Sequence, residues 1–319
     1  MMTATPLGGI HHVTALATDP AANLDFYTRV LGLRLVKRTV NFDDPGTHHL
    51  YFGDEEGRPG TILTFFPWPL ARRGSRGAGQ ATTTAFAVPG GSLAWWRQRL
   101  AQEGLPVGDA RERFGELVAG FLDPDGLKLE LVERAWAGDA PAWNDGPLPP
   151  QQAIRGLDAV ELLVRDAGPS LELLREGMGF AEIGREGSRV RLAAGDGPPG
   201  ARVDLVADAD ASFGRISAGT VHHVAWRAAD DRAQLAWRER LAGRGLDVTP
   251  VLDRCYFRSI YFREPGGVLF EIATDPPGFT LDEPVEELGG ALRLPAWLEV
   301  DRAHIEMVLP SLGLPGSAE

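Results

Sequence analysis

Two short segments of the chain share a histidine pair that could bind a metal ion. The pair lies in GIHHVT at 9–14 and again in TVHHVA at 220–225. A third candidate ligand is Glu271, the one acid in the otherwise apolar strand pattern GVLFEIAT. A carboxylate inside a core strand is costly unless it is paired or binds a metal. Two neutral imidazoles and one carboxylate would leave a divalent ion with open coordination positions, the ligand pattern of iron(II) oxygenases.

An ordinary strand histidine is a partly buried residue that bonds to the backbone. The recurrence of the pair at two matching places, with an acid on a matching strand, favours the metal interpretation. Because alternate residues of a strand share a face, His12 and Thr14 should point to one side and His11 to the other. The same alternation separates His223 from His222.

An internal repeat shows which elements must position these residues. Residues 81–133 align with 222–274 without a gap, which places Trp96 beside Trp237 and Glu130 beside Glu271. Residues 9–33 align with 156–180, which places Gly32 beside Gly179. The chain therefore reads as a duplication of a duplication.

Each repeat predicts one short strand, an amphipathic helix ended by glycine, and three more strands. In the first repeat the strands are separated by Asp-Asp-Pro-Gly and Arg-Pro-Gly turns. We predict an α+β fold of four βαβββ modules, at 9–67, 81–133, 155–206 and 220–274. The first two modules form a first half, 1–150, and the last two lie in a second half, 151–319. A Pro-, Gly- and Asp-rich linker spans 134–150, and the tail 275–319 carries a short helix near Trp297–Leu309.

The middle modules lack the opening histidines. Module two has Ala81-Thr82 there, and module three has Asp158-Ala159. We therefore expect Glu130 and Asp204, the acids on the matching late strands, to be solvated or salt-bridged. The remaining histidines, His48, His49 and His304, are predicted to be structural, and Cys255 to be a packing residue.

These motifs carry a family resemblance. The stretch GIHHVTALATDPAANLDFYTRVLGLRLVKRTVNFDDPGTHHLYFGD resembles the opening of ring-cleaving dioxygenases of the hydroquinone 1,2-dioxygenase type, in the vicinal-oxygen-chelate (glyoxalase-like) superfamily. TVHHVAWRA, Arg254, Tyr261 and Glu271 resemble the second half of the same proteins, so the likeness covers nearly the whole chain. One departure is His48, which stands where many relatives have tyrosine.

The resemblance implies mixed sheets curved into cups, with the metal cup shared by modules one and four. It implies that the second histidine of each pair is a ligand, so the metal set is His12, His223 and Glu271. It also implies an iron(II) cofactor, although Mn, Zn or Ni could take the same site, and the cleavage of a para-diol aromatic by O₂. Around the substrate it places His11, His222, Arg254, Tyr261 and Thr14.

In this mechanism an ionised substrate hydroxyl and O₂ take the open positions. Tyr261 and His222 are candidates to hold or move the substrate proton, because phenol and imidazole both donate and accept. Arg254 would balance anionic charge, although an ordinary ion pair at a turn fits its spacing equally well.

Three other functions remain open at this point. A glyoxalase-type isomerase on the same fold uses four protein ligands, but aligning GTILTF with GVLFEI puts Thr64 opposite Glu271. A catechol-type extradiol dioxygenase takes all its ligands from its second half, whereas here His12 must serve. A drug-binding protein of the bleomycin-resistance kind would need no metal triad.

Composition limits the partners. The net charge is −12 and the basic residues form no large cluster, which argues against nucleic acid or an anionic membrane. No apolar run approaches a membrane span, no signal peptide is evident, and the one cysteine fits a reducing cytoplasm. We therefore expect a cytoplasmic enzyme that binds a small aromatic and O₂. A homo-oligomer is compatible with the sequence.

Overall fold

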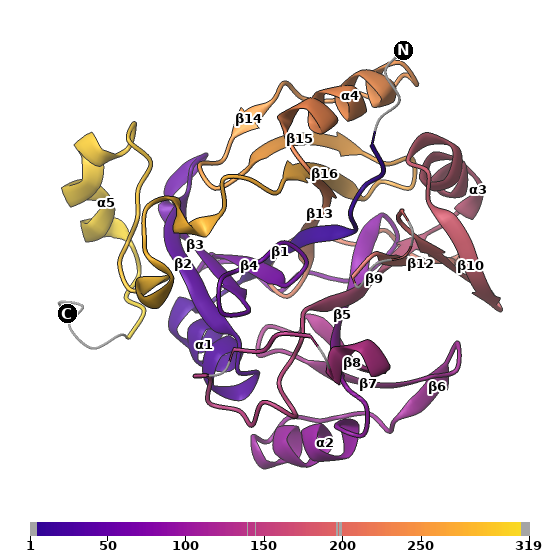
Figure 1. The fold of residues 1–319 in the computed structure, drawn as a ribbon, viewed down its shortest axis with the longest axis horizontal. Coiled ribbons are helices and arrows are strands. Elements are labelled where there is room, and N and C mark those ends of the chain that lie inside the picture. The colour runs from indigo at the N-terminus through magenta and orange to yellow at the C-terminus, as the bar shows by residue number, and fades with distance from the viewer. Residues whose placement is uncertain (1–4, 139, 144, 196, 198–199, 314–319) are drawn as a thin grey trace.

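The computed structural model describes residues 5–138, 140–143, 145–195, 197 and 200–313. Within these residues the chain forms two eight-stranded mixed sheets, each built from two βαβββ modules (Figure 1). The predicted α+β fold of four modules is confirmed. The first sheet joins module one to module four and the second joins module two to module three, so each sheet unites modules from both halves of the sequence.

The first sheet holds the candidate ligands. At its centre β1 (Ile10–Ala17) runs antiparallel to β13 (Val221–Ala228). Each of these two strands has a parallel neighbour on its other side, β4 (Ile62–Pro67) for β1 and β16 (Leu269–Thr274) for β13. The outer strands are β3 (Asp44–Gly53) and β2 (Arg34–Asn41) at one edge, and β15 (Arg258–Arg263) and β14 (Leu252–Asp253) at the other. The predicted sharing of one sheet by modules one and four is therefore confirmed.

The second sheet repeats this order. Its central antiparallel pair is β5 (Gln80–Pro89) and β9 (Leu157–Val164). The strands of module two continue as β8 (Lys128–Arg134), β7 (Glu116–Leu122) and β6 (Arg111–Arg113). Those of module three continue as β12 (Arg202–Ala207), β11 (Arg189–Ala193) and β10 (Ala181–Glu186).

The module helices confirm how the repeats pair. Modules one and three have short helices, α1 (Pro20–Asp25) and α3 (Ala167–Glu172), which continue into π-helical turns η1 (Phe26–Val30) and η3 (Leu173–Gly177). Asp19 and Asp166 cap these helices by accepting hydrogen bonds from backbone N–H groups of the first turn. Modules two and four have longer helices, α2 (Leu93–Gln102) and α4 (Asp231–Ala242), which pack on the outer faces of their sheets (Figure 1).

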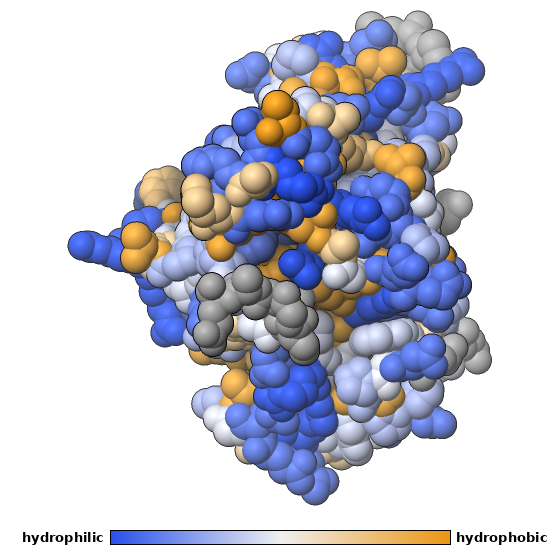
Figure 2. Space-filling model, turned by 90° about the vertical axis from the view of Figure 1, so that its left-hand side faces the viewer, coloured by the Kyte–Doolittle hydropathy of each residue, from blue (hydrophilic) through white to orange (hydrophobic). Residues whose placement is uncertain are grey.

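The C-terminal tail lies against the edge of the first sheet. It contains short 3₁₀ turns at Phe279–Leu281, Val285–Glu287 and Glu299–Asp301, and then α5 (Arg302–Val308), near the predicted position. The backbone N–H of Arg293 donates to the Arg38 carbonyl of the edge strand β2 at 2.9 Å, so the tail covers an edge that would otherwise be exposed. In Figure 2, which views this side, hydrophobic residues are scattered among hydrophilic ones.

The predicted linker, 134–150, is only partly regular. It begins with one 3₁₀ turn, Ala135–Gly138, and residues 139 and 144 of this segment lie outside the described residues. Leu148 packs against Gly32, where φ is +70° and an added Cβ would lie 2.5 Å from the leucine side chain. Among the residues described, no helix is long and apolar enough to cross a membrane.

Candidate metal centre

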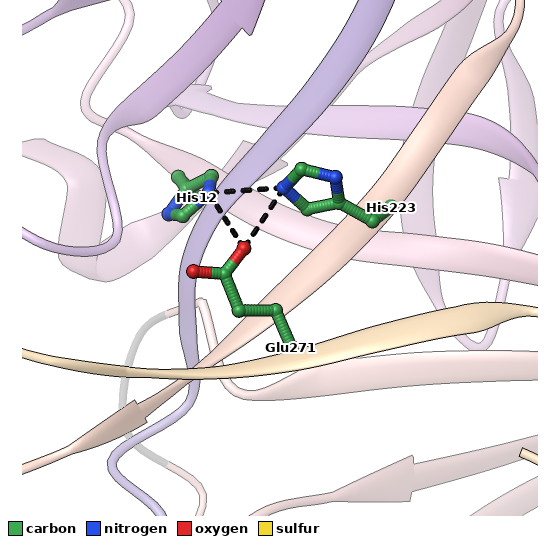
Figure 3. A group of neighbouring side chains, drawn as sticks. All are labelled: His12, His223 and Glu271. Atoms are coloured by element: carbon green, nitrogen blue, oxygen red, sulfur yellow. Dashed lines mark hydrogen bonds and ion pairs between the residues drawn. The ribbon is translucent and has the colours of Figure 1, made fainter. Parts of the chain in front are cut away.

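Three buried side chains converge between β1, β13 and β16 (Figure 3). The Nε2 atoms of His12 and His223 lie 3.3 Å apart. Oε2 of Glu271 lies 3.3 Å from the first of these nitrogens and 2.9 Å from the second. The structure therefore brings together, from two modules, the three residues that the family resemblance designates as ligands.

The donor atoms fit a divalent cation. Oε2 of Glu271 is buried, lies within ion-pair distance of both rings, and yet accepts no hydrogen bond of good geometry. Burial alone would raise the Glu271 pKa, but His12 and His223 hold it well below its usual range. Burial also lowers the His223 pKa. An ionised carboxylate beside a neutral imidazole is the protonation state that binds a metal ion.

The carboxylate is held by a residue that sequence reasoning missed. The Ser259 hydroxyl donates a hydrogen bond to Oε1 of Glu271, and both side chains are fully buried. This bond leaves Oε2 as the oxygen that faces the two histidines. Ser259 and Tyr261 lie two residues apart on β15 and therefore share a face of the strand. A search of the face that carries Tyr261 would have found Ser259.

Two β-bulges explain why both histidines of each pair approach the centre. The register between β1 and β13 shifts across His11 in one strand and across His222 in the other. A bulge inserts an unpaired residue and breaks the regular alternation of side chains. His222 therefore reaches the cavity, contrary to the expectation from regular alternation, whereas His11 lies beside His12 without lining the cavity.

The first histidine of each pair lies beside the candidate ligand that follows it. Nδ1 of His11 lies 2.9 Å from Nδ1 of His12, and Nδ1 of His222 lies 2.8 Å from Nδ1 of His223. A ligand that binds metal through Nε2 must carry its proton on Nδ1, which then donates to the neighbouring ring. The first histidine of each pair is thereby left with its own proton on Nε2.

A cavity of about 350 Å³ opens in front of this centre. Three predicted substrate residues, His222, Arg254 and Tyr261, line it together with the candidate ligands His12 and His223. His11 and Thr14 are buried behind the ligands and do not line it. The remaining lining residues, none of which was predicted, are Asn41, Phe42, Asp43, His49, Tyr51, Phe66, Trp68, Phe257 and Leu269.

Arg254 links the cavity floor to its mouth. Its Nε donates to the Tyr261 hydroxyl at 3.4 Å, and its Nη2 pairs with Asp43 at 3.0 Å. Burial and the nearby Glu271 carboxylate raise the pKa of Tyr261, so the phenol keeps its proton. The sequence left two roles open for Arg254, a charge-balancing group near the substrate and an ordinary ion pair at a turn. The structure is compatible with both, because Arg254 faces the cavity and also pairs with Asp43 at a turn.

The wall contributed by module one is a neutral hydrogen-bonded chain. Thr14 and Thr64 join through their hydroxyls at 3.0 Å, and Nε2 of His49 lies 2.8 Å from the Thr64 hydroxyl. The Tyr51 hydroxyl lies 2.9 Å from Nδ1 of His49. His49 therefore belongs to the cavity wall, and the prediction that it is structural stays a prediction. His49 and Tyr51 lie two residues apart on β3 and therefore share a face, and this spacing was the sequence signal that could have placed both in the wall.

Nε2 of His48 lies 2.8 Å from the Pro310 carbonyl, a contact that holds the tail and agrees with its predicted structural role. His304 is exposed on α5, so its predicted structural role stays a prediction. Cys255 packs, half-buried, against an aromatic cluster below the cavity.

The matching place in the second sheet holds an ion-pair network. Nη2 of Arg113 donates to Glu130 at 2.6 Å, and Nε of Arg191 donates to Asp204 at 2.7 Å. Both acids are buried and ion-paired, so the prediction of solvated or salt-bridged acids is confirmed through its second alternative. Among the described residues, the His12, His223 and Glu271 group is the only cluster with metal-ligand geometry.

The register of module two also needs a correction. The bulge in β5 falls at Thr82, so Thr82 and Thr83, rather than Ala81 and Thr82, stand at the places of the two β13 histidines. The pairing of β5 with β8 shows the same one-residue shift relative to that of β13 with β16. The gapless alignment missed it because its register was set on the helices.

Comparisons with known proteins agree with this architecture. The family described as the Glyoxalase/Bleomycin resistance protein/Dioxygenase superfamily matches residues 9–131 and 156–272. A Bacillus subtilis (strain 168) protein named as a ring-cleaving dioxygenase, MhqO, is 51% identical over 302 residues, covering 94% of this chain and 95% of that one. The chlorohydroquinone/hydroquinone 1,2-dioxygenase of Sphingobium indicum is 36% identical over 297 residues, covering 91% and 92%.

Solved structures point the same way. A crystal structure from Bacillus subtilis, described as that of a dioxygenase, superposes with a TM-score of 0.93 at 49% identity and covers 99% of this chain and 100% of that one. Glyoxalase I from Zea mays shares the fold, with a TM-score of 0.61 at 16% identity over 84% of this chain and 92% of the maize protein. This chain therefore belongs to the Glyoxalase/Bleomycin resistance protein/Dioxygenase superfamily, and it resembles members named as ring-cleaving dioxygenases along nearly its whole length.

Proposed function

We propose that the protein is an iron(II)-dependent dioxygenase that cleaves the ring of a hydroquinone-type para-diol with O₂. The observation that carries the proposal is the three-ligand set, His12, His223 and Glu271, at the base of an aromatic-lined cavity. The name of the Sphingobium indicum relative supports the substrate class.

The fourth ligand position separates this function from the isomerase. Thr64 pairs with Thr14 across β1 and β4 as Glu271 pairs with Ala225 across β13 and β16. A threonine thus stands at the place that would need an acid, and its hydroxyl is engaged by Thr14 and His49. Three protein ligands leave room for both a diol and O₂.

Bound iron would supply a Lewis acid for the substrate hydroxyl and a position for O₂. The protein's part is to hold the ring and its protons. His222 faces the cavity with Nε2–H available as a donor, and burial lowers its pKa to about 3, which keeps it neutral. Tyr261 receives a hydrogen bond from Arg254, so its own O–H is free to donate to the substrate.

His11 and Thr14 act at one remove in this proposal. His11 sets the tautomer of His12 through the contact between their Nδ1 atoms. Thr14 anchors Thr64 and thereby the module-one wall. Both are positioning residues, whereas His222, Arg254 and Tyr261 would meet the substrate.

The test is oxygen consumption by anaerobically iron-loaded protein given hydroquinone, methylhydroquinone or catechol. We expect one O₂ consumed per para-diol, a ring-opened acid as product, and catechol as the poorer substrate. Tyr261→Phe should bind iron normally yet turn over about 10²–10⁴-fold more slowly if the phenol acts as acid or base. A smaller loss would reduce Tyr261 to a packing residue. Preferred turnover of catechol would indicate an extradiol enzyme, and isomerisation of a thiol adduct of methylglyoxal without oxygen uptake would indicate an isomerase.

A further inference from the structure

We propose that the cavity selects para-diols whose ring substituents are uncharged and apolar, and that Asp43 enforces this choice by occupying Arg254. The inference rests on the proposed function, because it assumes that the cavity receives a diol. It adds a residue that determines specificity and predicts which substituted diols are rejected.

The charges around the cavity are already balanced. Among the described residues that line it, Arg254 is the one permanent cation and Asp43 the one carboxylate. Nη2 of Arg254 pairs with Asp43 at 3.0 Å, while its Nε faces the Tyr261 hydroxyl. A substrate carboxylate would therefore find no free cation on this wall.

Asp43 owes its position to the β2–β3 turn. The sequence predicted a turn at Asp-Asp-Pro-Gly, but β3 already begins at Asp44, and the turn is formed by Phe42 and Asp43. Asp43 thus sits at the cavity mouth, 73% exposed, and reaches across to Arg254 of module four. Asp44, one residue further on, instead accepts a hydrogen bond from the Thr47 hydroxyl.

The rest of the lining favours apolar substituents. Five apolar side chains line it, namely Phe42, Phe66, Trp68, Phe257 and Leu269. Burying a methyl group or a halogen against such a wall is favourable, because it removes apolar surface from water. A ring carboxylate would lose its water without gaining a partner, a substantial cost, and would also face the Asp43 carboxylate.

The experiment compares methylhydroquinone with 2,5-dihydroxybenzoate, which is the same para-diol with a ring carboxylate. In wild-type protein we expect kcat/KM to favour the uncharged diol strongly. In Asp43→Asn, the freed Arg254 can pair with the substrate carboxylate, so the ratio of the two kcat/KM values should move toward the acid by about tenfold. Asp43→Glu keeps the ion pair and should keep the wild-type ratio.

Asp44→Asn is the matched control. It changes the net charge by the same amount on the same hairpin, does not touch Arg254, and should leave the ratio as in wild type. Because the Asp43 ion pair is near the surface, the shift should shrink at high salt. A ratio that stays the same in Asp43→Asn, or that moves equally in Asp44→Asn, overturns the inference.

Binding separates this inference from the proposed function. Trp68 lines the cavity, so tryptophan fluorescence can report the Kd of each diol for the iron-loaded protein without oxygen. If no diol is turned over, the proposed reaction fails, yet a Kd preference that moves with Asp43→Asn still supports the charge selection. If turnover is normal but the wild-type protein binds and cleaves both diols equally well, the selection fails and the dioxygenase stands.

Discussion

Replacing Ser259 with alanine is expected to weaken metal binding while leaving the fold intact. The Ser259 hydroxyl is the donor that engages Oε1 of Glu271, and it is completely enclosed. Alanine removes the hydroxyl and little volume. The carboxylate would then be free to rotate, and neither of its oxygens would be directed at the point where His12 and His223 meet.

The size of the effect follows from the chemistry of the lost bond. A hydrogen bond to a charged group contributes about 1.5–3 kcal/mol, and loss of a partner that orients a metal ligand typically costs about 10–100-fold in affinity. These two ranges agree, because a tenfold change corresponds to about 1.4 kcal/mol. For a chain of 319 residues, the increase in Tm that saturating metal causes should be about 2–4 °C smaller in Ser259→Ala than in wild type.

The assay is chelator competition for anaerobic iron(II), together with thermal unfolding with and without metal. The matched control is Ser170→Ala, because the Ser170 hydroxyl also donates to a buried carboxylate, Glu264 at 2.6 Å, in a different part of the molecule. Both variants should lose some stability, but only Ser259→Ala should lose metal affinity. Equal iron affinity in Ser259→Ala and wild type would refute the assignment of Ser259 as the residue that orients Glu271.

Three further predictions test the ligands, the second sheet and a buried acid. His12→Ala should lose most bound iron, measured by metal analysis, while circular dichroism stays native; full iron retention would mean that modules one and four do not share the site. Glu130→Gln should keep wild-type iron content but lower the free energy of unfolding by about 1.5–3 kcal/mol, because it removes a charge-assisted hydrogen bond to the buried Arg113 and leaves Asp204 as the remaining carboxylate beside it; a large loss of iron would reveal a second metal site. Burial raises the pKa of Asp123 from 3.8 to about 6, so ionisation opposes folding and the contribution of Asp123 to stability should fall as pH rises from about 4 to 6. Asp123→Asn lacks this loss and should gain about 3 kcal/mol relative to wild type between pH 4 and 7 in urea titrations, whereas a constant difference would contradict the shift.

The sequence determined the modules and the main chemical groups because these depend on local patterns. Strand periodicity, the glycine at a helix end and the internal repeat are readable without tertiary contacts. Asp19 and Asp166 align in the repeat and cap equivalent helices in the structure. The histidine pairs and Glu271 stood out because they are polar residues in strands that are otherwise apolar, and the family resemblance designated the ligands among them.

Only the tertiary structure could decide how those strands pair. A bulge depends on the register between β1 and β13, two strands about two hundred residues apart, and neither strand's own pattern contains it. The bulges decide that His11 and His222 sit beside the ligands. In the same way, the one-residue shift that places Thr82 and Thr83 opposite β9 depends on pairing.

The lining of the cavity was equally hidden. Arg254 meets Asp43, 211 residues away, because a two-residue turn in one module reaches a loop of another. Ser259 matters only because strand pairing sets it against Glu271, and His49 only because β3 and β4 form one wall. Sequence patterns report which face of an element is apolar, but the choice of neighbour comes from register and packing between elements far apart in the chain. That choice turns a set of plausible residues into a site.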